Sequence, residues 1–464
     1  MILNGFEQHI KSGARCHLVG IGGVSMSPLA EILHGMGVLV TGSDANDGSA
    51  IENLRAKGID VTIGHLPENV HGAGIVIRTA AARDVNVEIA YARENGIPVF
   101  ERAEAWGYIM RGYKNAVCVA GVHGKTTTTS MVTHILLAAG ADPTIMIGGV
   151  LPALGGSGYR VGGGDVIALE SCEYYNSFHS FSPTVAVILN VDADHLDFFK
   201  DLDDLKSSFM KFASLVPQAG HIVCNGDDEN TMEALAPLGR ELFTFGLDHD
   251  DLRVRGVNVH ADGRNPSMEV LLDGKPFCKF TLQVPGLHNL KNALAAATAA
   301  ITLGIPAKAI EDGLYSYTGV GRRFEYKGTF NGADIYDDYA HHPCELRALL
   351  DAVSALGYDR VVLAFQPHTF SRTSALFPDF VTELSRPDLT FLAEIYAARE
   401  KNDIGVTSGD LAKAVPGSRC CESLPELAAQ IAAVAKKGDI ILTVGAGDIY
   451  KVGDELVSRV TAGN

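Results

Sequence analysis

A lysine and a threonine after a glycine turn are the first residues of this sequence with an evident chemical use. The stretch AGVHGKTTTT (120–129) follows the apolar run AVCV and precedes SMVTHILLAAG, which is typical of a helix. A strand, a glycine turn and a helix start present backbone N–H groups and a positive dipole end to phosphate oxygens. Lys125 can add a positive charge for the outer phosphates, and the Thr126 hydroxyl can bind a magnesium ion.

This loop is shorter than most phosphate-binding loops. The usual spacing G-x-x-x-x-G-K-[ST] requires a glycine where this chain has Val119, and the spacing here is G-x-x-G-K-T. A glycine turn capped by threonine is the structural alternative, but a strand before it and a helix after it favour phosphate binding. The predicted nucleotide-binding residues of the loop are Gly121, Val122, His123, Gly124, Lys125, Thr126 and Thr127.

A second glycine turn, GIGGVS, lies near the N-terminus. An acid, Asp44, follows the next expected strand at about the distance of a ribose-binding carboxylate. A purely structural turn is an equal alternative, yet two such turns suggest that the protein holds two nucleotides. The predicted binding residues here are Gly20, Gly22, Gly23, Ser25 and Asp44.

Acids and a histidine follow two expected strands of the middle segment. Glu170 ends VIALE, and LNVDADHLD places Asn190, Asp194 and His195 just beyond the next strand. Such groups can complete the shell of magnesium ions that bridge ATP and a substrate, although a single acid at a strand end is more often a helix cap.

Further along, GLHNLKN and three polar turns carry planar and charged side chains. Asn289 and Asn292 fall on one helix face and can read a base edge, with capping as the alternative. Arginine forks suit phosphate and carboxylate, so Arg323 and Arg372 are candidates for the γ-phosphate and a substrate carboxylate. The density of functional side chains around Arg323 and in DDYAHH (337–342) is poorly explained by structure alone.

Three segments that each restart a strand–turn–helix pattern would position these residues. Strands alternating with helices predict an α/β fold with parallel sheets, and the polar alternation over about 240–285 predicts antiparallel strands within the second segment. A chain of 464 residues is also long enough for about three domains of ordinary size. The expected architecture is a Rossmann-like N-terminal domain (1–111), a central phosphate-loop ATPase domain with a small antiparallel β portion (112–318), and a Rossmann-like C-terminal domain (319–464).

Composition narrows the class of protein. A net charge of -17 argues against general binding to nucleic acid or anionic membrane, which calls for a basic surface. The eight scattered cysteines include no C-x-x-C pair, which argues against a zinc site or a disulfide framework. With no signal-peptide core and no apolar run long enough for a membrane span, a cytoplasmic enzyme is expected.

Several of these motifs, in this order, resemble those of the Mur ligases, a family of ATP-dependent enzymes of peptidoglycan synthesis. The resemblance spans about residues 17–450, and it explains the shortened loop, which is the form that the family uses. It implies a UDP-sugar domain, a central ATPase and an amino-acid domain. The motifs are GIGGVSMSPLAEIL, AGVHGKTTTT, LNVDADHLD, GLHNLKNALAA, GVGRRFE, DDYAHHP and FQPHTFSRT.

The resemblance also implies roles at the ATP site. Lys125 and Thr126 would contact the phosphates and a first Mg²⁺ ion, and Glu170 and His195 would hold a second. The family's acidic run is here ESCEYYNSF, so a contribution of Glu173 stays open. No lysine is assigned the carbamylation that other family members carry.

For the rest of ATP and for the amino acid, the resemblance implies a second group of residues. Catalysis would use Lys125, Arg323 and a histidine base, either His195 or one of the pair 341–342, with His342 included in the catalytic set. The implied ATP contacts outside the loop are Asn289, Asn292, Arg323 and Asp338, and the implied amino-acid contacts are Tyr339, His341 and Arg372.

The first glycine turn and DDYAHHP fit best the family activity that joins L-alanine to UDP-N-acetylmuramate with ATP, in a monomer or a homodimer. Family members often have glycine where this chain has Ser25 and Pro28, which leaves the diphosphate contacts open. The alternatives are a recycling ligase that adds a tripeptide to the same sugar, a Mur ligase for another amino acid, and a non-catalytic nucleotide-binding scaffold. A non-catalytic scaffold has no need of a complete catalytic set, so the presence of all of its members argues against that alternative; they are Lys125, Thr126, Glu170, His195 and Arg323.

Overall fold

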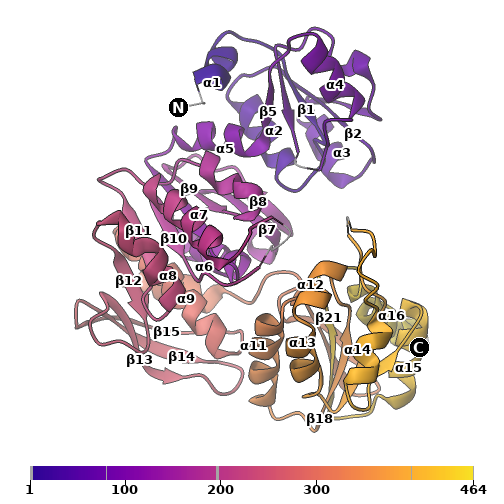
Figure 1. Ribbon diagram of the computed structural model, residues 1–464. Helices are drawn as coiled ribbons and strands as arrows, with labels where there is room; N and C mark the ends of the chain where they lie inside the picture. The colour runs from indigo at the N-terminus through magenta and orange to yellow at the C-terminus, as the bar shows by residue number, and fades with distance from the viewer. Residues whose placement is uncertain (1–3, 80, 195–197, 399, 463–464) are drawn as a thin grey trace. The chain divides into compact units, whose positions relative to one another are not determined.

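The chain contains three β-sheets, each with helices packed on it (Figure 1). The computed structural model describes residues 4–79, 81–194, 198–398 and 400–462. Two compact units are distinguished by their internal contacts: residues 1–255 with 271–275 and 294–313, and residues 256–270 with 276–293 and 314–464. The predicted class, three α/β domains, is confirmed, while the domain boundaries themselves stay a prediction.

The N-terminal sheet is parallel, with strand order β3-β2-β1-β4-β5. The order reverses direction between β1 and β4, and in open α/β sheets ligands bind at such a switch point, beyond the carboxyl ends of the strands. The predicted sugar turn follows β1 there. The strands are β1 Cys16–Val19, β2 Val40–Asp44, β3 Asp60–Ile63, β4 Ile75–Arg78 and β5 Val99–Glu101; the helices are α1 Asn4–Lys11, α2 Met26–Gly35, α3 Ser49–Ala56, η1 Pro67–Val70, α4 Val87–Glu94 and α5 Arg102–Met110.

The central sheet has ten strands in the order β15-β14-β13-β12-β11-β10-β6-β9-β7-β8. Its middle is parallel, and β6 lies between β9 and β10, so the loop that follows β6 is flanked by the ends of both neighbours. The strands are β6 Asn115–Ala120, β7 Thr144–Leu151, β8 Ser157–Arg160, β9 Val166–Glu170, β10 Val185–Ile188, β11 His221–Asn225, β12 Phe243–Gly246, β13 Val254–His260, β14 Ser267–Leu272 and β15 Lys275–Thr281. The helices are α6 Lys125–Ala138, η2 Pro152–Leu154, η3 Tyr174–Ser180, α7 Leu202–Ser214, α8 Glu229–Leu235, η4 Ala236–Leu238, α9 Leu287–Thr302 and α10 Ala307–Ser316.

The antiparallel portion of this sheet is small, as predicted. Two residues join β14 to β15, a connection that only antiparallel neighbours allow. At the start of the same stretch, however, β12 pairs in parallel with both β11 and β13. β12 lies before the segments whose polar alternation predicted antiparallel strands, and its short apolar run has no periodicity that distinguishes a parallel from an antiparallel strand.

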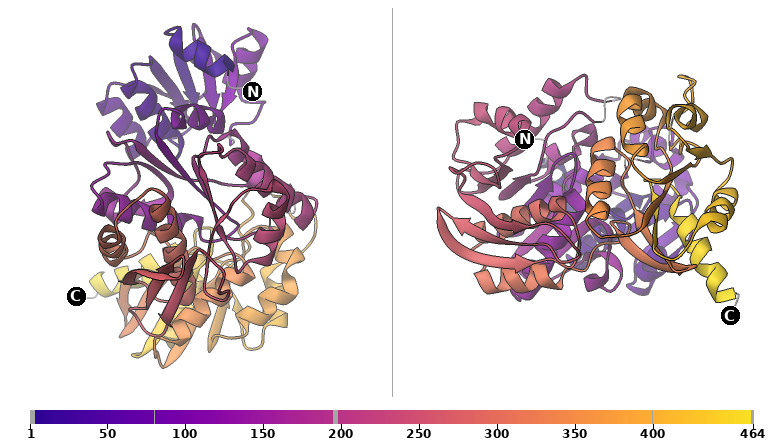
Figure 2. Two further views of the ribbon diagram at one scale, coloured as in Figure 1. Left: turned by 90° about the vertical axis from the view of Figure 1, so that its left-hand side faces the viewer. Right: turned by 90° about the horizontal axis from the view of Figure 1, so that it is seen from below.

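The C-terminal sheet has the order β16-β17-β21-β18-β19-β20, with β16 antiparallel at the edge and the other strands parallel. One apolar cluster lies under α11, α13 and α14, and another lies under α15 and α16, so helices cover both faces (Figure 2). The strands are β16 Glu325–Phe330, β17 Ala333–Asp338, β18 Arg360–Phe365, β19 Leu389–Leu392, β20 Arg419–Cys420 and β21 Asp439–Val444; the helices are α11 Pro343–Ser354, α12 Phe370–Ala375, α13 Phe377–Leu384, α14 Ser408–Ala414, α15 Leu424–Val434 and α16 Tyr450–Ala462.

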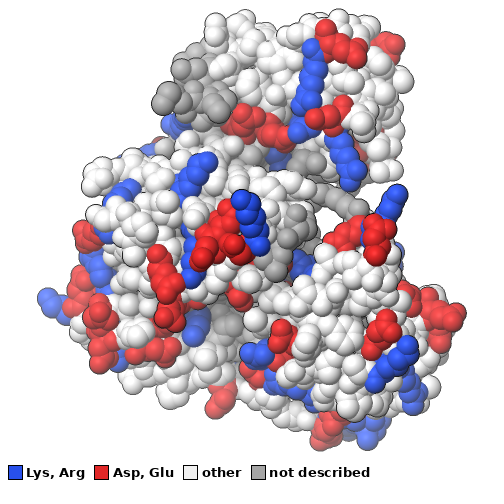
Figure 3. Space-filling view, viewed as in Figure 1, with Lys and Arg blue, Asp and Glu red and all other residues white. Residues whose placement is uncertain are grey.

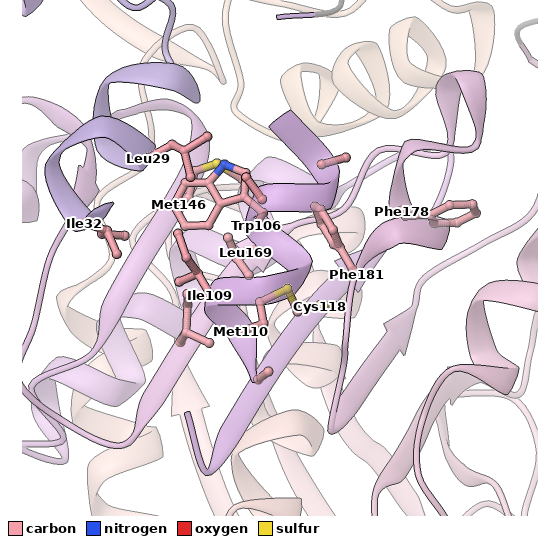
Figure 4. Packing of buried hydrophobic residues seen from close by; sticks show 14 of the residues in the cluster. Leu29, Ile32, Trp106, Ile109, Met110, Cys118, Met146, Leu169, Phe178 and Phe181 are labelled. Atoms are coloured by element: carbon pink, nitrogen blue, oxygen red, sulfur yellow. The ribbon is translucent and has the colours of Figure 1, made fainter. Parts of the chain in front are cut away.

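Helix α5 packs directly on the segment that follows the central strand β9. A Cβ on Gly107 would lie 1.8 Å from the carbonyl oxygen of Ser180, so only glycine allows this approach. The single tryptophan, Trp106, is buried beside it, together with residues of α2, β6, β7 and β9 (Figure 4). Its indole N–H donates to the carbonyl and hydroxyl oxygens of Ser25, both at 3.2 Å. The glycine turn at residues 20–25 is therefore fixed to the same hydrophobic core as the central sheet.

Among the helices of the described residues, none combines the length and the apolar character that a membrane crossing requires.

Candidate active site

The phosphate loop connects β6 to α6, as predicted. Gly121 and Gly124 have φ values of 144° and 85°, which other residues rarely adopt, and α6 begins at Lys125. The side chain of Asn190, beyond β10, holds the loop: its Oδ1 accepts from the N–H of His123 at 2.8 Å, and its Nδ2 donates to the His123 carbonyl at 3.0 Å. Asn190 is thus a loop anchor, which the sequence had suggested only as a polar residue near the metal site.

Lys125 points to a buried carboxylate that sequence reasoning left open. Its Nζ donates to the carbonyls of Gly121 (2.5 Å) and Val122 (3.0 Å) and lies 3.0 Å from Glu173 Oε2. Glu173 is 1% exposed. Burial lowers the pKa of Lys125, but the charge of Glu173 and the neighbouring acidic groups outweigh this effect and raise it above its usual value. The ammonium therefore stays charged over the whole physiological range.

Thr126 and Glu170, which the sequence assigned to two different magnesium ions, are hydrogen-bonded to each other, and their metal-binding role stays a prediction. The Thr126 hydroxyl donates to Glu170 Oε2 at 2.9 Å, and the Gly148 N–H donates to the same oxygen at 2.8 Å. A hydroxyl and carboxylates are oxygen ligands of the kind that Mg²⁺ takes, with waters completing its shell. The described side chains contain no group of three or more His, Cys, Asp or Glu residues arranged for a metal. The predicted ligand His195 lies outside the described residues.

The glycine turn at residues 20–25, predicted to bind the UDP-sugar, is held by the carboxylate of Asp44. Asp44 Oδ2 accepts from the N–H of Gly22 at 2.9 Å, and Gly20 has a φ of 78°. Ser25 precedes α2 but does not cap it through its side chain, because its hydroxyl accepts from Trp106. Asp44, the last residue of β2, thus contacts the turn that follows β1 and contains Gly20, Gly22, Gly23 and Ser25, and the binding of a sugar nucleotide by these residues stays a prediction.

In the second unit, Asp338 organises the turn that carries Arg323. Its two oxygens accept from the N–H groups of Phe324 (2.7 Å) and Ala340 (2.8 Å). Burial raises the pKa of Asp338 to about 6, against the opposing effect of Arg323. The Arg323 guanidinium lies 5.0 Å from the centre of the Tyr339 ring. The predicted ATP residues 323 and 338 are therefore neighbours.

The predicted amino-acid residues lie at the carboxyl ends of β17 and β18. The ring of His341 is 5.6 Å from that of Tyr339 and 5.8 Å from that of His368, and Arg372 Nη1 lies 3.3 Å from His368 Nδ1. His368, which sequence reasoning did not single out, joins the others into one cluster. The signal for it was its place in FQPHTFSRT, the same short motif that supplied Arg372.

The two adjacent histidines have different surroundings. His342 is 4% exposed and caps α11, with its Nδ1 accepting from the Cys344 N–H at 3.3 Å. His341 donates from Nδ1 to the Tyr339 carbonyl at 3.0 Å. A capping role explains the position of His342, and of the two histidines, His341 is the one within the aromatic cluster.

The two asparagines predicted for adenine also differ. Asn289 is 7% exposed and donates to the Pro285 carbonyl at 2.7 Å, which matches the structural alternative. Asn292, one turn further along α9, is half-buried. Beside them, burial and then the nearby Arg323 lower the pKa of His288 to about 4, so this imidazole is neutral at pH 7.

The surface charge agrees with the composition. On the face shown in Figure 3, basic and acidic side chains are interspersed, and no continuous basic surface is visible.

Comparison with known proteins identifies three family models along the chain. Residues 15–114 match "Mur ligase family, catalytic domain", residues 119–300 match "Mur ligase middle domain", and residues 322–447 match "Mur ligase, glutamate ligase domain". Together they cover most of the described sequence.

Curated relatives and solved structures agree with these matches. A UDP-N-acetylmuramate–L-alanine ligase of Clostridium novyi is 43% identical, with 95% of this chain and 96% of the relative covered. One of Lachnospira eligens is 44% identical, covering 95% and 97%. The crystal structure of a UDP-N-acetylmuramate-alanine ligase of Thermotoga maritima has a TM-score of 0.80 at 30% identity, covering 97% and 100%. A murein peptide ligase of Psychrobacter arcticus shares the fold, with a TM-score of 0.70 at 23% identity, covering 96% and 98%.

Proposed function

The chain belongs to the Mur ligase family, and we propose that it joins L-alanine to UDP-N-acetylmuramate while ATP is converted to ADP and phosphate through an acyl phosphate, a step of peptidoglycan precursor synthesis. The observation that carries this proposal is identity of 41–44% to alanine-adding ligases over nearly the whole of both chains. The phosphate loop and the cluster at Tyr339 supply the groups that this reaction requires.

The first chemical step activates a poor electrophile. The muramyl carboxylate attacks the γ-phosphorus of ATP, the bond to the β-phosphate oxygen breaks, and an acyl phosphate and ADP result. The main task in such a transfer is to neutralise charge on the phosphoryl oxygens. Lys125, which is charged and begins α6, serves the outer phosphates, and Arg323 serves the γ-phosphate in the same reaction.

Two Mg²⁺ ions are part of this proposal. The Thr126 hydroxyl and the Glu170 carboxylate are the described groups that would hold magnesium, with His195 as a further ligand. Magnesium supplies positive charge to the phosphate oxygens and orients them for transfer. The contribution of this chain is the fixed placement of the two oxygens, which Gly148 maintains by donating to the carboxylate.

In the second step the alanine amine attacks the acyl carbonyl, and phosphate leaves from the tetrahedral intermediate. Arg372 would bind the alanine carboxylate, and Tyr339 and His341 would line its side of the pocket. The amine must lose a proton, for which His341 and His195 are the candidate bases. We place the reaction in the cytoplasm, where ATP is available, and in a monomer or a homodimer.

Phosphate release from ATP tests the proposal directly. With Mg²⁺ present, release should require both UDP-N-acetylmuramate and an amino acid, with L-alanine preferred over D-glutamate and over L-alanyl-γ-D-glutamyl-meso-diaminopimelate. Preference for the tripeptide would make the chain a recycling ligase. Absence of turnover despite ATP binding would overturn the enzymatic assignment.

A further inference from the structure

The side chains of the adjacent residues Arg322 and Arg323, in GVGRRFE, make different contacts. Backbone φ values of 61° at Arg322 and 49° at Phe324 lie in the left-handed region, which is costly for residues other than glycine. The N–H of Arg322 donates to Glu325 Oε2 at 2.8 Å, and its carbonyl accepts from the Tyr339 N–H at 2.8 Å, so the turn is held on both sides. As a result the two side chains make different contacts, and only that of Arg323 is assigned to ATP.

Arg322 binds three acceptors from two strand ends. Its Nε donates to Asp337 Oδ2 at 3.0 Å, its Nη1 to the Gly447 carbonyl at 3.0 Å, and its Nη2 to the Gly445 carbonyl at 2.6 Å. Asp337 is the penultimate residue of β17, and the glycines form the turn between β21 and α16. A planar fork of donors can satisfy three such acceptors at once, whereas an ammonium cannot reach them all.

The same guanidinium lies against the aromatic wall of the amino-acid cluster. Its central carbon is 4.9 Å from the centre of the Tyr339 ring and 4.8 Å from that of Tyr450, distances at which a cation is attracted to a ring face. Tyr339 therefore has Arg322 and Arg323 as cationic neighbours. Loss of Arg322 would remove one of the two arginine contacts of this ring, which also lies against His341.

The turn at residues 445–447 links Arg322 to a second part of the amino-acid cluster, at His368 and Arg372. A Cβ on Gly447 would lie 2.7 Å from ring atoms of Tyr396, so Tyr396 packs directly on this turn. The ring of Tyr396 stacks on His368 at 5.7 Å, and His368 contacts Arg372. Arg322 thus reaches the cluster by two routes, through Tyr339 and through Gly447.

We infer that Arg322 is a positioning residue for the amino-acid pocket: it holds the Tyr339 ring and the 445–447 turn so that Tyr339, His368 and Arg372 keep the spacing that a small amino acid requires. This inference rests on the proposed function, because it deepens the role of the same cluster. Arg322 itself touches no substrate and determines affinity for the amino acid rather than for ATP.

The chain offers a matched control. Arg360 donates from Nε and Nη2 to the two oxygens of Asp439 (3.1 and 2.6 Å) and to the Val434 carbonyl at 2.8 Å. Both pairs join an arginine of similar exposure to a buried aspartate in the same sheet, but Arg360 and Asp439 begin β18 and β21, at the opposite end of the strands. R322K and R360K therefore make the same chemical change at the two ends of one sheet.

The experiment compares steady-state kinetics and thermal unfolding of the full-length wild type, R322K and R360K. We expect R322K to raise the KM for L-alanine at least tenfold, to change the KM values for ATP and the UDP-sugar less than threefold, and to lower Tm no more than R360K does. R360K should leave all three KM values unchanged. A uniform change of the three KM values in R322K, or a fall in Tm with unchanged KM values, would overturn the inference.

A second measurement keeps this test separate from the proposed function. Hydrogen exchange of the peptides that contain residues 337–342 and 445–450 should accelerate in R322K and not in R360K. Unchanged exchange in R322K would overturn the positioning role even if wild-type protein turned over no substrate. A wild type that prefers another amino acid would overturn the alanine assignment alone, and the KM comparison would then use that amino acid.

Discussion

Lys125 Nζ lies 3.0 Å from Glu173 Oε2, and the two residues are 48 positions apart in the chain. The ammonium of the phosphate loop is thus held by a buried carboxylate and by two carbonyls of its own loop. A nucleotide phosphate has to compete with these groups for Lys125. Their arrangement keeps the charge in place before the nucleotide arrives.

This pair gives a prediction about stability and activity together. K125M should lower kcat by roughly 100-fold or more, because it removes a charge that stabilises the transition state. It should also destabilise the protein by about 3 kcal/mol, because it leaves Glu173 buried without its cation. Adding E173Q should restore much of the stability and none of the activity. Chemical unfolding of the single and double variants measures the coupling, and additive effects would contradict it.

The contact between Thr126 and Glu170 predicts a dependence on magnesium. T126A should raise the Mg²⁺ concentration for half-maximal rate by about tenfold or more, because it removes one predicted oxygen ligand. T126S, which retains the hydroxyl, should stay near wild type. Chelation with EDTA should abolish phosphate release in all three proteins, and excess Mg²⁺ should restore it. Equal magnesium requirements for T126A and T126S would exclude a ligand role for the hydroxyl.

Substitution of the two asparagines of α9 should affect different properties: stability for Asn289 and ATP binding for Asn292. N289A should lower the free energy of unfolding by about 1–2 kcal/mol, because the Pro285 carbonyl loses its donor. N292A should leave stability nearly unchanged and weaken ATP binding about tenfold, since a good hydrogen bond to a base edge is worth that much. Calorimetric titration with ATP and urea unfolding test both variants. The reverse pattern would assign adenine contact to Asn289.

Acid should destabilise the first unit through a buried histidine. His134 in α6 is 7% exposed, and burial lowers its pKa to about 4. The unfolded chain takes up this proton below about pH 6.5 and the folded chain does not, so stability is present above that pH and is lost as pH falls towards 4. The loss between pH 7 and pH 5 is about 2 kcal/mol.

H134Q should reduce this loss, whereas the same change at the exposed His249 should not. Urea unfolding at pH 7 and at pH 5 makes the comparison. An identical pH dependence of wild type and H134Q would mean that this imidazole is protonated in the folded state as well.

Local chemistry explains what could be predicted. A glycine turn between a strand and a helix is encoded within about ten residues, so GVHGKT and its flanks predicted the strand–turn–helix unit that the structure shows as β6, the turn and α6. The three α/β segments followed in the same way, because alternation of buried strands and helices is a short-range pattern. The parallel pairing of β12 with β11 and β13 required the structure, because strand pairing depends on residues far away in the chain.

Tertiary structure alone decided which polar side chains face one another. The sequence by itself determined the residue types, their order along the chain and the family they resemble. It could not assign Glu173 to Lys125, Asn190 to the loop, or Arg322 to the turn at Gly445 and Gly447, because these contacts join residues 48, 67 and more than 120 positions apart. Hydrogen bonds act over about 3 Å, so such pairs form only after the strands are placed side by side, and the sheet order that places them is a property of the whole fold.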